Sequence, residues 1–292
     1  MKSTFGLVKR NLTIYFRDPV GVFLSLLGAI ILLLLYALFL GSLQVDTIRA
    51  QLPQATDEEI MGFVSSWVFA GILMMTTLTS GLGSMSAFVD DRITDRFKEF
   101  RVMPVLPWQI ILGYQIAAFT VALTMSTLIL IVGYVAIGVM NSSWIEPQLL
   151  FQAFGCVALM CFAFAAFSAF IVSFIVSHSA FTAINTIIGT ILGFLAGAYL
   201  PVGTISAEVA NVINSLPFSP SAMLLRRPLA GDPLTTLSGG VAEAESALRE
   251  YYGFDLSIGS RLLKPEWILL ELAAIAIVFT ALSAVRIGRR IK

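Results

Sequence analysis

The fold is decided by residues 62–140, which read GFVSSWVFAGILMMTTLTSGLGSMSAFV (62–89), DDRITDRFKEFR (90–101), VMPVLPWQ (102–109) and IILGYQIAAFTVALTMSTLILIVGYVAIGVM (110–140). Each of the two apolar runs exceeds the roughly 20 residues that a helix needs to cross a bilayer. The segment between them is strongly charged and therefore lies outside the bilayer. This stretch predicts two membrane-spanning helices joined by a charged segment.

The rest of the chain repeats this alternation. Of its 292 residues 58% are hydrophobic and 12% are charged, with a mean hydropathy of +0.89, values typical of a membrane protein. We predict an all-α membrane protein with one transmembrane domain over residues 1–292. The first apolar run is too long for a signal peptide, and no small-residue cleavage site follows it. The six predicted spans are Val20–Leu40, Gly62–Val89, Ile110–Met140, Leu149–Val176, Ala180–Leu200 and Trp267–Val285.

The distribution of Lys and Arg predicts the orientation of the chain. With six spans, one side of the membrane holds twelve basic residues and the other holds six, five of which belong to one long loop. The positive-inside rule then places both termini in the cytoplasm. The net charge is zero, which disfavours nucleic acid as a partner. The cytoplasmic set is Lys2, Lys9, Arg10, Arg17, Arg92, Arg96, Lys98, Arg101, Arg286, Arg289, Arg290 and Lys292.

The first 18 residues predict a helix that lies in the membrane interface. Phe5, Val8, Leu12, Tyr15 and Phe16 share one arc of a helical wheel, opposite most of the basic residues. A merely basic flank that sets topology is the alternative. The Asp18-Pro19 pair that follows predicts a sharp turn into the first span.

The charged segment Asp90–Arg101 predicts a helix with a narrow apolar seam. Ile93, Phe97 and Phe100 stand at i, i+4 and i+7, and the remaining positions are polar or charged. Such a seam suits a groove on another protein. A solvated helix on the membrane surface would have the same pattern.

Residues 91–117 resemble the cytoplasmic signature of the permease subunits of type-2 ATP-binding-cassette (ABC) exporters. Asp95 and Tyr114 depart from that signature, where glycine and a basic residue are common. Residues 197–226 resemble the external segment of the same family, punctuated by Pro201, Pro217 and Pro220. The signature positions that match are Asp91, Arg92, Pro104, Trp108, Ile110, Ile111, Leu112 and Gly113.

The resemblance implies a plasma-membrane export complex in which this chain is the permease and not the enzyme. The chain has no Gly-Lys dipeptide, so it lacks the phosphate-binding loop of an ATPase. It would bind no cofactor, and ATP and Mg²⁺ would belong to a separate ATP-binding subunit. A second permease, identical or homologous, would complete the complex. The residues implied to dock the ATPase subunit are Asp91, Arg92, Ile93, Arg96, Phe97 and Phe100.

Polar residues gather in the second and fifth predicted spans, and in the related exporters these two spans line the central cavity. Flanking Met and Phe side chains would make its wall apolar and adaptable. We therefore expect an amphipathic or hydrophobic export substrate, such as a drug, an antimicrobial peptide or a lipid-like molecule. Hydroxyls that bond back to their own helix are the alternative. The predicted lining is Met75, Thr76, Thr79, Ser80, Phe181, Thr182, Asn185 and Thr186.

Two further features carry weaker signals. Gly189, Gly193 and Gly197 give one helix face without side chains, which predicts close helix packing, with dimer contact or pathway lining as alternatives. The external segment, residues 201–265, predicts a small cap with membrane re-entry near Val202–Leu216 and a helix over Val241–Tyr252.

Two other classes of protein are weighed against the exporter. An ion-coupled secondary transporter needs ionisable groups inside the membrane, and Glu271 is the only clear one. A membrane enzyme needs a nucleophile and base or a metal cluster, but the chain has a single histidine, His178, and Cys156 and Cys161 are spaced wrongly for a CxxC site. No metal site is predicted.

Overall fold

The computed structural model describes residues 2–36, 41–94, 96, 97, 99, 106–140 and 144–291, and these residues are almost entirely helical. The elements are α1 (Lys2–Phe16), α2 (Pro19–Leu35), α3 (Gly41–Gln51), α4 (Asp57–Ser84), α5 (Ser86–Ile93), α7 (Pro107–Met140), α8 (Pro147–Val172), α9 (His178–Leu195), η2 (Val202–Thr204), α10 (Ala207–Asn214), α11 (Phe218–Leu237), α12 (Ala242–Tyr251), β1 (Ser257–Ile258), β2 (Arg261–Leu262) and α13 (Pro265–Ile291).

Among the described residues, five helical stretches are long and apolar enough to cross a membrane. They are α4 continued by α5, then α7, α8, α9 and α13. Helices α1 and α2 would supply a sixth span if taken together, and they are bent by 76°. Six spans were predicted, and the last five of them are confirmed as apolar helices of sufficient length. The first predicted span is helical over Pro19–Leu35, and residues 37–40 lie outside the described part of the chain.

The turn predicted at Asp18-Pro19 is confirmed. Helix α1 ends at Phe16, and α2 begins with Pro19, whose fixed φ suits the first position of a helix. The Asp18 carboxylate accepts a hydrogen bond from the Gly21 N–H at 2.9 Å and so caps α2. The chain therefore changes direction before it enters the bundle.

Helix α4 is the centre of the bundle. It packs against α2, α3, α7, α8, α9 and α11, and Phe63, Trp67 and Leu73 on it have no exposed surface. A capping box begins the helix, since the Thr56 N–H donates to Glu59 at 2.8 Å and the Glu59 N–H donates to Thr56 at 3.3 Å. Because six other helices surround α4, protein shields its apolar residues on most sides.

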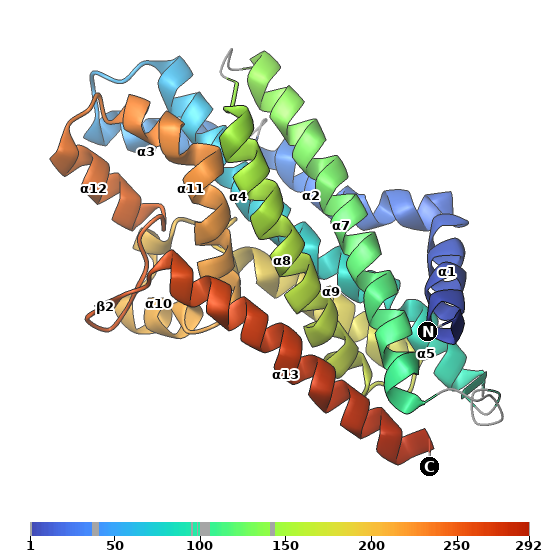
Figure 1. Cartoon of the computed structure of the whole chain (residues 1–292). Coiled ribbons are helices and arrows are strands. Elements are labelled where there is room, and N and C mark those ends of the chain that lie inside the picture. The colour runs from blue at the N-terminus through green and yellow to red at the C-terminus, as the bar shows by residue number, and fades with distance from the viewer. Residues whose placement is uncertain are drawn as a thin grey trace.

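The bundle has two distinct ends (Figure 1). Helix α1, α5 and the last turns of α13 lie at one end, called here the terminal end. Helices α3 and α12 lie at the opposite end. Both ends of the chain thus reach the same side of the bundle.

The segment between α9 and α13 differs from its prediction. The predicted helix Val241–Tyr252 is confirmed as α12. A second helix, α11, was not predicted, and it contains Pro228 and Pro233 in its interior. The membrane re-entry expected near Val202–Leu216 stays a prediction. Helix α11 is the element of this segment that packs against α4 and α8. Burial of Ala222, Leu225 and Leu229 on α11 offsets the helix-breaking cost of the prolines.

Candidate functional site

The terminal end holds a cluster of charged side chains around Asp91. Helix α5 follows α4 directly after Met85, and together they form one long stretch, Asp57–Ile93, so the charged segment begins within the last turn of that stretch. Of the helix predicted over Asp90–Arg101, the first four residues belong to α5, Thr94 is a turn, and Arg96, Phe97 and Glu99 are again helical. Lys98, Phe100 and Arg101 lie outside the described residues.

Asp91 is 1% exposed and is held by three side chains from other parts of the chain. Arg10 on α1 makes a bidentate ion pair with the Asp91 carboxylate, with N–O distances of 2.6 and 2.5 Å. The Tyr114 hydroxyl on α7 donates a hydrogen bond to the same carboxylate, and Arg96 approaches it at 3.3 Å. Such paired, hydrogen-bonded contacts are what a buried carboxylate requires.

Helix α1 reaches this cluster because of a glycine. A Cβ at Gly113 on α7 would lie 2.9 Å from the Leu7 Cβ, closer than side chains pack. Gly113 therefore allows α1 to lie directly against α7, which brings Arg10 to Asp91. This position is one of those that match the exporter signature, and Tyr114, which departs from it, supplies a hydroxyl to the cluster.

The residues on either side of Asp91 contact different helices. Arg92 donates to the carbonyls of Ser173 and Ile175, at 3.0 and 2.7 Å, just beyond the C-terminus of α8, where helix carbonyls lack partners. Asp90 lies 3.2 Å from the His178 ring nitrogen at the start of α9. Three consecutive residues of α5 therefore connect it to α1 and α7, to α8 and to α9.

The side chains of the apolar seam predicted for partner docking do not share one surface: one faces the bundle and another is exposed. The Phe97 ring packs 5.2 Å from Phe88 and 6.5 Å from Tyr114, measured between ring centroids, so it faces the bundle. Ile93 is 39% exposed, and the Arg96 side chain is 53% exposed. Of the predicted docking set, Ile93 and Arg96 are therefore the described residues that present most surface to a partner.

The predicted pathway residues lie on two helices that touch each other, α4 and α9. Thr76 and Ser80 are buried within the chain, while Met75, Thr79 and Asn185 are half-buried. The Thr76 and Thr79 hydroxyls donate to carbonyls of their own helix at 2.8 and 3.0 Å. Phe181 is 8% exposed, and Thr182 and Thr186 are exposed on α9.

The three glycines of the predicted packing face, two in α9 and one just beyond its end, have different surroundings. Gly189 has open space where a side chain would begin, and the Tyr199 ring covers Gly193. Gly197 has a φ of +61° and terminates the helix, with N–H groups of Gly197 and Ala198 donating to the carbonyls of Phe194 and Gly193. Within one chain, Gly189 alone offers the open face that close packing by another helix needs.

The opposite end is organised by Arg226, which sequence reasoning did not single out. This side chain on α11 has no exposed surface and donates to the carbonyls of Ala196 and Gly197 at 2.8 Å and of Gly253 at 3.2 Å. Its guanidinium also lies 5.4 Å from the Trp67 ring centroid. Burial lowers the pKa of this guanidinium, but an arginine remains charged at neutral pH. Arg226 therefore fixes the end of α9 against α11 and α4.

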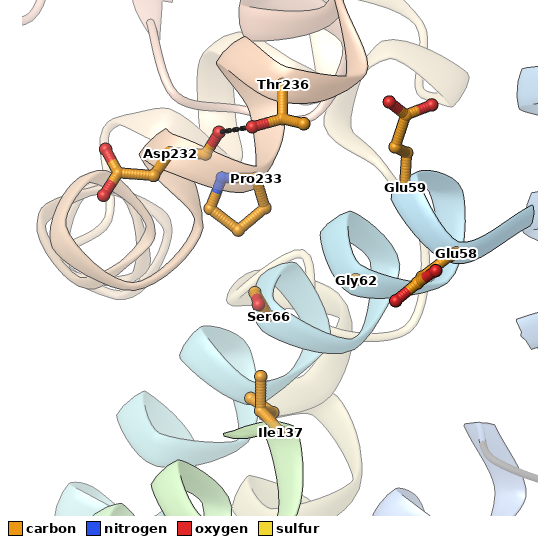
Figure 2. Close-up of a pocket in the computed structure, with 8 residues that line it drawn as sticks. All are labelled: Glu58, Glu59, Gly62, Ser66, Ile137, Asp232, Pro233 and Thr236. Carbon is orange, nitrogen blue, oxygen red and sulfur yellow. Dashed lines mark hydrogen bonds between the residues drawn. The ribbon is translucent and has the colours of Figure 1, made fainter. Parts of the chain in front are cut away.

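A hollow of about 220 Å³ also opens at this end, between the first turns of α4 and the second half of α11 (Figure 2). Its rim is acidic, and Gly62 and Ser66 leave room at its floor. No group of three potential metal ligands occurs among the described parts of the chain. The lining residues are Glu58, Glu59, Gly62, Ser66, Ile137, Asp232, Pro233 and Thr236.

Comparison with known families gives one match. Residues 2–224 match the family model described as ABC-2 type transporter. The match includes α1, the Asp91 cluster, α9 and the start of α11. No curated protein matches the chain.

Proposed function

Because the chain belongs to the ABC-2 type transporter family, we propose that it is the permease subunit of an ATP-driven exporter in the plasma membrane. It is a multi-pass membrane protein and a type-2 ABC permease. ATP and Mg²⁺ would be bound by a separate ATP-binding subunit, and a second permease would complete the complex. The terminal end would face the cytoplasm, with α1 in the membrane interface, as the distribution of basic residues predicts.

The Asp91 cluster is the observation that supports coupling to an ATPase at the terminal end. The exposed side chains of Ile93 and Arg96 lie directly beside residues that contact α1, α7, α8 and α9. A partner that displaces α5 would act on all four helices at once, because packed elements move as units. ATP-driven movements of the docked subunit would reach the spans through this coupling segment.

The docking proposal predicts that substitutions at two residues of the seam affect different properties, binding of the ATP-binding subunit at one and stability of the permease at the other. Ile93→Ser is expected to weaken binding of the ATP-binding subunit about thirtyfold, since an interface anchor contributes about 2 kcal/mol, without changing the thermal midpoint of the isolated permease. Phe97→Ala is expected to lower that midpoint, because its ring packs on Phe88 and Tyr114. Binding is measured by titrating the purified ATP-binding subunit. Unchanged binding by Ile93→Ser would refute docking at this surface.

The substrate pathway is proposed to follow the junction of α4 and α9. Thr182, Thr186 and Thr190 form an exposed row on α9 in the single chain. Polar rows are unfavourable against lipid, so a second permease or a substrate cavity would cover this face. Met75 and Phe181 beside it would give the cavity an adaptable apolar wall. This composition favours a drug, an antimicrobial peptide or a lipid-like substrate.

Asn185→Leu is expected to change substrate-stimulated ATP hydrolysis by about fivefold, the effect of one lost hydrogen bond of about 1 kcal/mol. Thr79→Val tests the α4 side of the same junction. Thr124→Val, an exposed threonine on α7, is the matched control and is expected to change nothing. The measurement is ATPase stimulation by a panel of hydrophobic cations, peptides and lipids in the reconstituted complex. If both test variants behave like the control, the proposed lining is wrong.

A further inference from the structure

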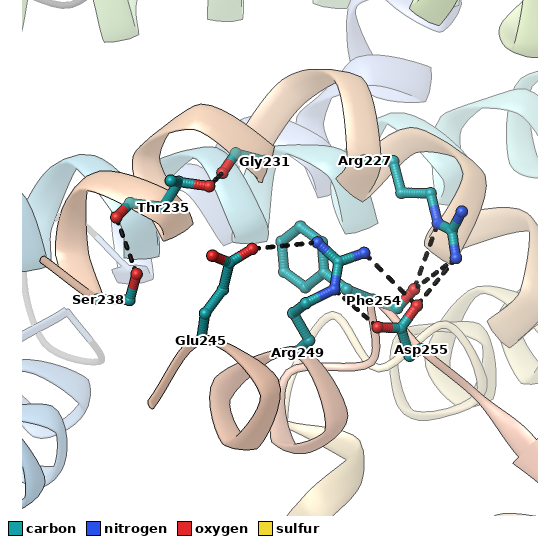
Figure 3. Close-up of polar contacts among 8 residues, drawn as sticks. All are labelled: Arg227, Gly231, Thr235, Ser238, Glu245, Arg249, Phe254 and Asp255. Carbon is teal, nitrogen blue, oxygen red and sulfur yellow. Dashed lines mark hydrogen bonds and ion pairs between the residues drawn. The ribbon is translucent and has the colours of Figure 1, made fainter. Parts of the chain in front are cut away.

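The segment between α9 and α13 carries five basic residues, three of which have partners. Arg226 binds backbone carbonyls, as described above. Arg227 and Arg249 share the carboxylate of Asp255, at N–O distances of 2.9 and 2.7 Å, and Arg249 also lies 3.7 Å from Glu245 (Figure 3). Asp255 raises the pKa of the Arg249 guanidinium. These three cations are therefore used in holding the segment together.

The other two, Arg261 and Lys264, are exposed and form no ion pair with any described residue. Both line one open hollow of about 690 Å³. No carboxylate is among its lining residues, so both of its charged side chains are positive. The remaining lining side chains are apolar or aromatic: Ile258, Leu262, Leu263 and Trp267.

The backbone that carries these cations is held in place. Arg261 lies on β2, which pairs antiparallel with β1, and Gly259 in the turn has a φ of +60°. The Gly259 N–H donates to the Asn211 side chain at 2.8 Å, and the Asn214 side chain donates to the Ser257 carbonyl at 3.0 Å. Helix α10 thereby anchors the hairpin, so the hollow exists before any ligand arrives.

The hollow also lies where the chain would meet the membrane surface. Lys264 immediately precedes α13, an apolar helix long enough to cross a bilayer. Trp267, in the first turn of α13, is 68% exposed, and Leu262 in the hairpin is 62% exposed. Exposed tryptophan at the start of a span is typical of the headgroup level.

We propose that this hollow binds an anionic phospholipid, with Arg261 and Lys264 on its phosphate and headgroup. The apolar side chains and Trp267 would contact the upper part of the acyl chains. Paired cations at headgroup depth recognise acidic lipids in preference to zwitterionic ones. The inference requires only that α13 crosses the membrane, so it does not depend on docking of an ATPase or on export.

Trp267 provides a direct test by quenching with brominated lipid. In a Trp108→Phe/Trp144→Phe background, Trp267 is the exposed fluorophore, because Trp67 is fully buried. The full-length protein in detergent is titrated with dibrominated phosphatidylglycerol and, separately, with dibrominated phosphatidylcholine. We expect half-maximal quenching at a concentration of phosphatidylglycerol about tenfold lower than that of phosphatidylcholine, because each surface cation attracts the acidic headgroup.

Arg261→Gln/Lys264→Gln is expected to abolish this difference, and Arg261→Lys to retain most of it. Lys9→Gln/Arg17→Gln removes two exposed cations at the terminal end and is expected to behave like the parent. Thermal midpoints show whether each variant is folded. Equal quenching by the two lipids, or an undiminished preference in the double Gln variant, would overturn the proposal. Full displacement of brominated phosphatidylglycerol by millimolar inorganic phosphate would assign a phosphate site and exclude a lipid site.

Discussion

Asp91→Ala is expected to destabilise the permease by about 3–5 kcal/mol, the typical cost of removing one partner from a buried ion pair. The substitution leaves Arg10 beside an apolar interior and removes the acceptor of the Tyr114 hydroxyl. It also releases α1 from α5, so coupling to ATP hydrolysis should be lost. The measurements are the thermal midpoint of the purified protein in detergent and substrate-stimulated ATPase activity of the complex.

Asp90→Ala is the matched control for this prediction. Asp90 is the adjacent residue, its side chain is 49% exposed, and its ion pair within the described part of the chain is with His178, so its loss is expected to cost less than about 1 kcal/mol. Arg10→Met/Asp91→Leu removes both charges and is expected to recover most of the stability. If that double variant also recovers coupled hydrolysis, the cluster is only structural. Equal midpoints for Asp90→Ala and Asp91→Ala would contradict the burial argument.

Arg226→Met is expected to produce the second large effect, about 3–5 kcal/mol of lost stability. The substitution preserves side-chain length but leaves the carbonyls of Ala196, Gly197 and Gly253 without their donor in a site closed to water. The end of α9 would then separate from α11. We expect a lower thermal midpoint and faster proteolysis of the segment between α9 and α13.

Arg227→Met tests whether the large loss of stability is due to the burial of Arg226. Arg227 is the next residue of α11, and its side chain is 31% exposed and paired with Asp255. A partly exposed ion pair of this kind contributes at most about 1 kcal/mol. A loss of stability as large as that of Arg226→Met would show that both arginines act through the same surface network and would refute a special role for Arg226.

Much of the fold could be predicted from local sequence. Five of the six predicted spans, the turn at Asp18-Pro19 and α12 follow from apolar length, proline geometry and helical periodicity, all of which are read along the chain. Helix α11 could not be predicted this way. Its prolines argue against a helix locally, and only burial against α4 and α8 reverses that preference.

The candidate site was also predicted in part from local sequence and decided in part by tertiary packing. The sequence singled out Asp90–Arg101 as the informative segment, and this segment lies within the residues that match the family. It placed Asp91 and Phe97 on a docking surface, however, whereas the structure buries Asp91 and packs Phe97 against the bundle. The spacing of the seam residues along the chain cannot reveal that Phe88 and Tyr114 cover the Phe97 ring.

The sequence by itself determined which stretches are apolar enough to cross a membrane and which segment between them is charged, because the free energy of transfer from water to lipid depends on the residues of each stretch alone. Only the tertiary structure decided which charges are buried. Arg10 and Asp91 are 81 positions apart, and Arg226 and Gly253 are 27 apart. These pairs form because helix packing brings distant backbone and side-chain groups together and excludes water from them, and no local pattern records which groups will meet.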